Sequence, residues 1–130
     1  MEVVVEYLPP LKDVPRVKLK GEVDIYTVNA LKKSVQVLLD EGHNTLIMDL
    51  TDVVYIDSTG LGALVGIYRR CREREGKIYL ICPNPQVKKV FKTTGLSQLF
   101  AFYESEEEFE TLIEEEKKNP KGEEEKKTSK

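Results

Sequence analysis

The chain has 130 residues, of which 40% are hydrophobic and 33% charged, and it carries a formal net charge of −3 at pH 7. This length suits one compact domain, and the negative charge argues against direct binding to nucleic acid. No apolar run approaches the roughly 20 residues that cross a bilayer and the N-terminus does not resemble a signal peptide, so we expect a cytoplasmic protein without membrane contact.

The first fifty residues predict two strands, a helix and a third strand. Residues 1–7 and 16–20 alternate apolar and polar side chains around a proline-rich turn, which is typical of an antiparallel pair. From Val28 onward apolar residues recur at helical spacing, and Gly42 suits a left-handed helix end. Residues 45–50 are almost continuously apolar, as expected for a central strand that is covered on both faces.

The second half of the chain continues the alternation of helices and strands. Asn84 followed by Pro85 is a typical helix start, and Ser105 with Glu108 forms a capping box. The order predicts an α/β fold with a mixed sheet of about five strands and about four helices, mainly on one face. The predicted elements are a helix over 59–75, a strand over 77–82, a helix from Pro85 to about residue 94, a strand over 98–103 and a helix through Ile113.

The last part of the chain differs in composition from the rest. Residues 114–130 contain no apolar side chain and equal numbers of acidic and basic ones. Such a segment buries too little apolar surface to offset the entropy lost on ordering. We therefore expect one domain over residues 1–113 and a charged, disordered tail over 114–130, for which a role in partner binding stays open.

The segment from Val53 to Gly66 contains the most informative pattern, because a predicted strand passes into a helix there through the residues DSTG. Binding sites in open α/β sheets collect at the carboxyl ends of strands, where a helix N-terminus presents unpaired N–H groups. A purely structural interpretation is also possible. In it Ser58 or Thr59 caps the helix, and Gly60 and Gly62 allow close packing on the sheet.

Several kinds of chemistry fit this segment poorly. It matches neither phosphate-binding glycine pattern, and DSTG is not the nucleophile elbow of a hydrolase. The single histidine, His43, lies in a predicted turn without support as a general base. Asp49, Asp52 and Asp57 do not follow a metal-ligand spacing, and Cys71 and Cys82 are expected to be packed thiols in a reduced compartment. We expect no enzyme activity, metal or cofactor.

A hydroxyl at a glycine-lined helix N-terminus is well suited to accept a phosphoryl group from another enzyme. Phosphorylation of Ser58 would add about −1.5 to −2 charges. The helix terminus favours this charge, so the fold should survive. Beside Asp57 and Asp24, however, the same charge would repel an acidic or apolar surface docked there.

The chain resembles the STAS domain family and, within it, the bacterial anti-sigma factor antagonists, over about residues 1–113. Three segments in the same order and spacing carry this resemblance: GEVDIYT at 21–27, DSTGLG at 57–62, and VKKVF with TGL between 87 and 96.

The resemblance implies that Ser58 is the phosphorylated serine and that Asp24 is the acidic residue after the second strand. It also implies partner switching. The unphosphorylated protein would bind an anti-sigma factor that is a serine kinase and so free a sigma factor for transcription, phosphorylation would end the complex, and a serine phosphatase would reset it. The expected partner-binding residues are Asp24, Asp57, Thr59, Gly60, Leu61 and Gly62.

Three alternatives stay open at this point. Asp24 could cap the first helix together with Thr27, either instead of or in addition to a partner contact. The domain could be a stand-alone STAS scaffold or a transport-complex subunit that lacks reversible phosphorylation. A nucleotide-binding domain is a further alternative, against which the absence of a phosphate-binding lysine argues.

Overall fold

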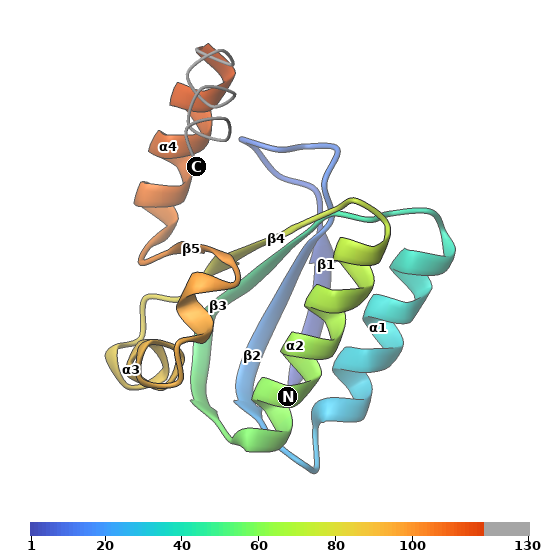
Figure 1. Ribbon diagram of the computed structural model, residues 1–130, viewed down its shortest axis with the longest axis vertical. Helices are drawn as coiled ribbons and strands as arrows, with labels where there is room; N and C mark the ends of the chain where they lie inside the picture. The colour runs from blue at the N-terminus through green and yellow to red at the C-terminus, as the bar shows by residue number, and fades with distance from the viewer. Residues whose placement is uncertain (119–130) are drawn as a thin grey trace.

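Five strands form one mixed sheet in the computed structural model, which describes residues 1–118 (Figure 1). Their spatial order follows the chain from β1 to β5. β1 pairs antiparallel with β2, and each later neighbouring pair is parallel. The predicted mixed α/β sheet is therefore confirmed. The strands are β1 (Glu2–Glu6), β2 (Arg16–Val23), β3 (Leu46–Ile56), β4 (Ile78–Ile81) and β5 (Ala101–Tyr103).

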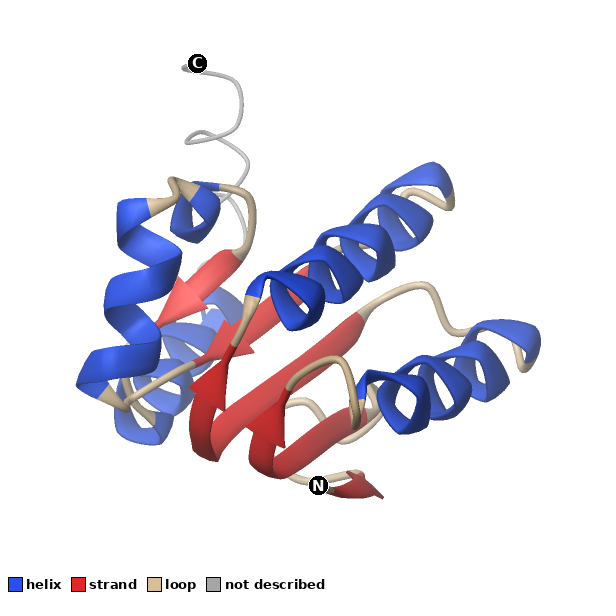
Figure 2. Cartoon of the chain, turned by 90° about the horizontal axis from the view of Figure 1, so that it is seen from below, coloured by secondary structure: helices blue, strands red, loops and turns tan. Residues whose placement is uncertain are grey.

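Three of the four α-helices in this part of the chain cover one face of the sheet, and the last covers part of the other (Figures 1 and 2). A single-turn 3-10 helix precedes β5. This arrangement agrees with the expectation that the helices lie mainly on one side. The helices are α1 (Val28–Asp40), α2 (Ser58–Glu73), α3 (Pro85–Thr93), the 3-10 helix (Leu96–Gln98) and α4 (Glu106–Lys118).

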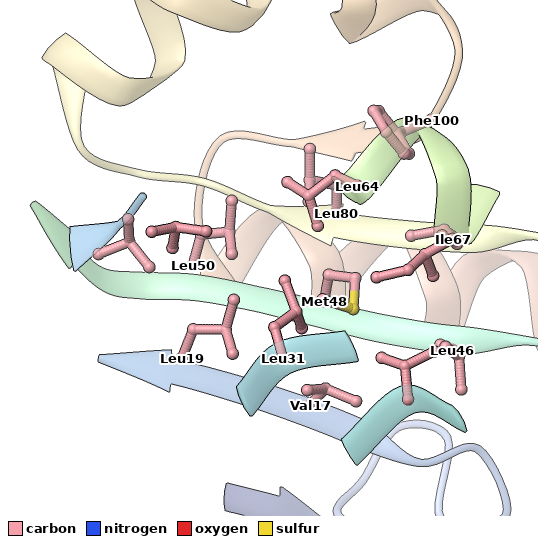
Figure 3. Close-up of a cluster of buried hydrophobic side chains, with 14 of the residues drawn as sticks. Val17, Leu19, Leu31, Leu46, Met48, Leu50, Leu64, Ile67, Leu80 and Phe100 are labelled. Carbon is pink, nitrogen blue, oxygen red and sulfur yellow. The ribbon is translucent and has the colours of Figure 1, made fainter. Parts of the chain in front are cut away.

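The larger core lies between the sheet and α1 to α3. Leu64 and Ile67 of α2 point toward the central strands, near Met48 and Leu80 (Figure 3). All four side chains are buried. Burial of a large apolar side chain stabilises the fold by about 1.5–3 kcal/mol, so this layer holds α2 firmly on the sheet.

The smaller core lies on the opposite face, under α4. Successive strand residues point to opposite faces, so Ile47 and Tyr79 face away from α1 to α3. Phe109 and Ile113 of α4 pack with them.

A buried charge cluster also ties α4 to the sheet. Arg16 of β2 is 3% exposed, and its guanidinium group donates to Asp49 of β3 at 3.3 Å. The same group makes a two-pronged contact with Glu106 of α4, in which Nη2 donates to Oε2 at 3.2 Å. Asp49 is thus the partner of a buried cation.

Several boundaries differ from the predictions. The last strand begins at Ala101 and not at residue 98, because residues 96–98 form the 3-10 helix, and β2 runs on past residue 20 to Val23. β3 continues beyond residue 50 to Ile56, because its second half pairs with β2 although it contains polar residues. α4 continues to Lys118, so residues 114–118 of the expected tail are helical, and the rest of that tail lies outside the described residues. Tertiary pairing and helix propagation both extend elements past the point where their apolar pattern ends.

Candidate functional site

The candidate site lies where β2 and β3 end side by side. Val23, the last residue of β2, pairs with Ile56, the last residue of β3. The N–H of Asp57 donates to the carbonyl oxygen of Val23 at 3.2 Å. The turn that leads into α1 and the junction that leads into α2 therefore leave the sheet at the same end, where β2 and β3 have their carboxyl termini (Figures 1 and 2).

Asp57 is the residue that caps α2. Its backbone is extended, and its Oδ1 accepts a hydrogen bond from the N–H of Gly60 at 2.9 Å. A carboxylate at this position satisfies a helix N–H group and also interacts favourably with the helix dipole. The interpretation in which Ser58 or Thr59 caps the helix is therefore wrong.

Ser58 is the first residue of α2, and its side chain is exposed. Among the described residues its hydroxyl group has no hydrogen-bond partner. Thr59 is half-buried and also lacks a side-chain hydrogen bond within residues 1–118. The cap formed by Asp57 thus leaves the hydroxyl group of Ser58 free for an external group.

Asp24 and Thr27 order the turn before α1. Oδ1 of Asp24 accepts from the N–H groups of Tyr26 and Thr27, at 2.9 and 3.1 Å. The hydroxyl group of Thr27 donates to the carbonyl oxygen of Glu22 at 2.8 Å. Thr27 occupies the N-cap position without a side-chain capping bond to α1, so this pair fixes a turn and does not cap the helix in the expected way. No described residue donates a hydrogen bond to Oδ2 of Asp24, so this oxygen is available as an acceptor.

The glycines of α2 serve different purposes. Gly60 is buried, and a Cβ built on it would lie 2.5 Å from the carbonyl oxygen of Val23. A Cβ on Gly62 would meet no atom of residues 1–118 within 4 Å. The interpretation that glycine allows close packing on the sheet is therefore confirmed for Gly60 and wrong for Gly62. Leu61 between them is half-buried at the rim of the larger core.

Two apolar residues at this corner were not singled out in the sequence. Ile25 is 61% exposed and Tyr26 is 91% exposed, and both lie in the turn that Asp24 holds. Adjacent large apolar side chains that are this exposed are candidates for a protein-binding surface. The sequence does contain a signal for this surface, since two large apolar side chains stand in a turn, outside the helical repeat that begins at Val28.

The cysteines, possible metal ligands and helix lengths of the described part of the chain were predicted from the sequence and can be compared with the structure. Residues 1–118 contain no group of three or more histidine, cysteine, aspartate or glutamate side chains that could hold a metal ion. Cys71 and Cys82 are buried, as expected, and desolvation raises the pKa of each thiol to about 11. Thiols with such pKa values are poor nucleophiles at neutral pH. None of the helices in this range is both long and apolar enough to span a membrane.

Comparison with known proteins agrees with this arrangement. An anti-sigma-B factor antagonist from Staphylococcus epidermidis is 33% identical over 95 residues, which are 73% of this chain and 88% of that protein. An anti-sigma-B factor antagonist from Listeria monocytogenes is 37% identical over 79 residues, or 61% of this chain and 69% of that protein.

Structural and family comparisons extend the match. The crystal structure of an anti-sigma factor antagonist from Mycobacterium paratuberculosis superposes with a TM-score of 0.74 over 87% of this chain and 93% of that one. At 24% identity this match shows a shared fold. The sequence model of the STAS domain family matches residues 9–109, which include both turns of the candidate site. The chain therefore belongs to the STAS domain family.

Proposed function

We propose that this protein is an anti-sigma factor antagonist whose binding to its partner is switched by phosphorylation of Ser58. Unphosphorylated, it binds an anti-sigma factor that is a serine kinase, and so releases a sigma factor for transcription. The kinase uses ATP to phosphorylate Ser58, which ends the complex, and a serine phosphatase removes the phosphate. The chain itself catalyses neither step and acts in the cytoplasm without a cofactor.

The observation that carries this proposal is the environment of the Ser58 hydroxyl group. It is exposed at the first position of α2 and has no hydrogen-bond partner within residues 1–118. A kinase can therefore reach it without opening the fold. Asp57 already caps the helix, so phosphorylation removes no bond on which α2 depends.

The charge distribution supports a switch of binding without a change of fold. Phosphate at a helix N-terminus is favoured by the helix dipole and by free N–H groups. Asp24 and Asp57 lie at the same corner, so the added charge of about −1.5 to −2 concentrates negative potential there. A partner docked on this corner would have to bury that charge, at a cost that weakens the complex.

The proposed contact surface consists of the two turns together. Ile25 and Tyr26 supply exposed apolar area, and the open oxygen of Asp24 supplies a hydrogen-bond acceptor. Gly60 acts from beneath by holding α2 against the end of β2. The remaining members of the proposed surface are Asp57, Thr59, Leu61 and Gly62.

The first experiment tests the modification. Incubation with the cognate anti-sigma factor kinase and ATP should add one phosphoryl group to the wild-type chain and none to Ser58→Ala. Thr59→Ala is the comparison variant. It removes the neighbouring hydroxyl group of the proposed surface, so its rate of phosphorylation can fall, but its final extent should stay at one phosphoryl group. Modification of Ser58→Ala to the wild-type extent would refute the site.

The second experiment tests the switch. Ser58→Ala should bind the kinase as tightly as the wild type, whereas Ser58→Asp should bind at least about tenfold more weakly with an unchanged circular dichroism spectrum. If Ser58→Asp keeps wild-type affinity, the chain is better explained as a STAS scaffold or transport-complex subunit. Hydrolysis of ATP by the purified chain alone would instead favour a nucleotide-binding function.

A further inference from the structure

A hollow of about 590 Å³ lies between α1 and α2, which run side by side in Figure 1. Its volume is within the range of roughly 300–1,000 Å³ that is usual for binding sites. Thr59 lines it, so the hollow begins next to Ser58 and continues along α2 as far as Arg70. We call it the α1–α2 groove.

The groove has an apolar floor made partly of bare backbone. Ala63 and Ile67 line it and are buried, and Gly62 and Gly66 lie one turn apart on the same side of α2. A Cβ on either glycine would meet no atom of residues 1–118 within 4 Å, so packing within this part of the chain does not explain them. Each glycine disfavours the helix by about 1 kcal/mol relative to alanine, and leaves room for a close approach from outside.

The rim of the groove is positively charged. Lys32 and Lys33 of α1 and Arg70 of α2 line it, and no acidic side chain of residues 1–118 does. None of the three cations forms an ion pair with any residue in the described range, in contrast to Lys18, Lys88 and Lys92. The chain as a whole carries a net charge of −3, so this positive rim is a local feature.

We propose that the α1–α2 groove binds an acidic helix of the same kinase that docks at Ser58. Unpaired cations favour carboxylates, and a floor of glycine and alanine lets a helix approach closely. Because Thr59 joins the groove to the Ser58 corner, one partner surface can cover both. This inference deepens the proposed function and depends on it for the identity of the partner.

The overall charge argues against nucleic acid as the occupant. Among the described residues only three cations line the groove, and the chain as a whole has a net charge of −3. Nucleic acid binding surfaces usually carry an extended basic patch on a positively charged domain.

The test compares charge reversal inside and outside the groove. Affinity for the purified kinase that phosphorylates Ser58 is measured at low and physiological salt. Lys32→Glu/Lys33→Glu should weaken binding about tenfold and reduce its salt dependence. The control Lys12→Glu/Lys20→Glu has the same net charge but changes exposed lysines away from the groove, so it should bind like the wild type.

A second variant tests the shape of the groove without relying on charge. Gly66→Leu fills open space and improves helix propensity, so its thermal unfolding temperature should not fall. Its affinity for the kinase should nevertheless drop about tenfold, because the side chain occupies the floor.

The outcomes separate this inference from the proposed function. If Ser58→Asp weakens binding while both groove variants bind like the wild type, the groove proposal is overturned and the switch at Ser58 stands. If Ser58→Asp also binds like the wild type, the proposed function fails. Binding of duplex DNA at physiological salt that is lost in Lys32→Glu/Lys33→Glu would assign the groove to nucleic acid and overturn the proposal.

Discussion

The starts of α2 and α3 are two versions of the same junction, in which a parallel strand passes into a helix. Each helix is capped by the side chain of a residue whose own backbone is extended. Asp57 accepts from the N–H of Gly60 at 2.9 Å, and Asn84 accepts from the N–H groups of Gln86 and Val87 at 2.9 and 3.3 Å. Local hydrogen bonding alone therefore does not distinguish the candidate site at α2 from the helix start at α3.

The difference lies in the residues that follow the cap. α3 begins with Pro85, which has neither an N–H nor a hydroxyl group, and its third residue, Val87, is buried in the core. α2 begins with the exposed Ser58, and its third residue is the buried Gly60. The start of α3 is therefore closed to an external anion. The start of α2 presents a hydroxyl group, and a glycine rather than a bulky side chain holds it against the sheet.

The largest expected effect on stability concerns the glycine that holds α2 in place. Gly60→Ala should lower the free energy of unfolding by about 1–3 kcal/mol, because the new Cβ overlaps the backbone oxygen of Val23. Gly62→Ala is the matched control, and should raise it by about 1 kcal/mol because its Cβ points into open space. Urea denaturation measures both values. Equal effects would mean that Gly60 has no special packing role.

The next test removes the cap from each junction. Asp57→Ala and Asn84→Ala should each cost about 1 kcal/mol in the free energy of unfolding. Asp57→Ala should cost somewhat more, because its carboxylate also interacts with the helix dipole. Equilibrium denaturation of both variants in the same buffer checks the ranking. A clearly larger loss for Asn84→Ala would show that α2 does not depend on its cap as we infer.

A smaller change in stability is expected when α2 is given the first residue of α3. Ser58→Pro should change the free energy of unfolding by less than about 1 kcal/mol, since proline suits the first helical position. Asp57, with φ −102° and ψ −176°, already has the extended backbone that a following proline requires. The variant should fold but accept no phosphoryl group, as measured by circular dichroism and mass spectrometry. Phosphorylation of this variant would contradict the assignment of Ser58.

The smallest effect concerns the exposed ion pairs beside α3. Lys88 and Lys92 contact Glu104 at 3.1 and 3.2 Å, and their hydrogen bonds lower the pKa of that carboxyl group below its ordinary value of 4.5. A lowered pKa in the folded state means that the stabilisation is complete above pH 4.5 and is lost as the pH falls through the folded-state value.

Glu104→Gln should therefore reduce stability slightly at neutral pH and make no difference in strong acid. The effect should also shrink with added salt, because the pair is exposed. Thermal unfolding of both proteins across this pH range measures it. A difference that grows toward acid would contradict the sign of the pKa shift.

Local sequence patterns determined much of this protein before any tertiary contact was known. The helical repeat after Val28, the helix start at Asn84–Pro85 and the left-handed Gly42 are all predicted by local sequence and confirmed by the structure. Such features depend on neighbouring residues, whose backbone preferences act over a few positions. The junction at Ser58 could be found for the same reason, because a strand and a helix meet there within one short segment.

Only the tertiary structure decided which atoms of that junction are free. It separated the buried Gly60 from the open Gly62, and brought the exposed Ile25 and Tyr26 to the same end of the sheet as α2. It also formed the α1–α2 groove and joined Arg16 to Glu106 across most of the chain. These features depend on strand order and helix packing, which place distant residues together and leave no periodic signal along the chain.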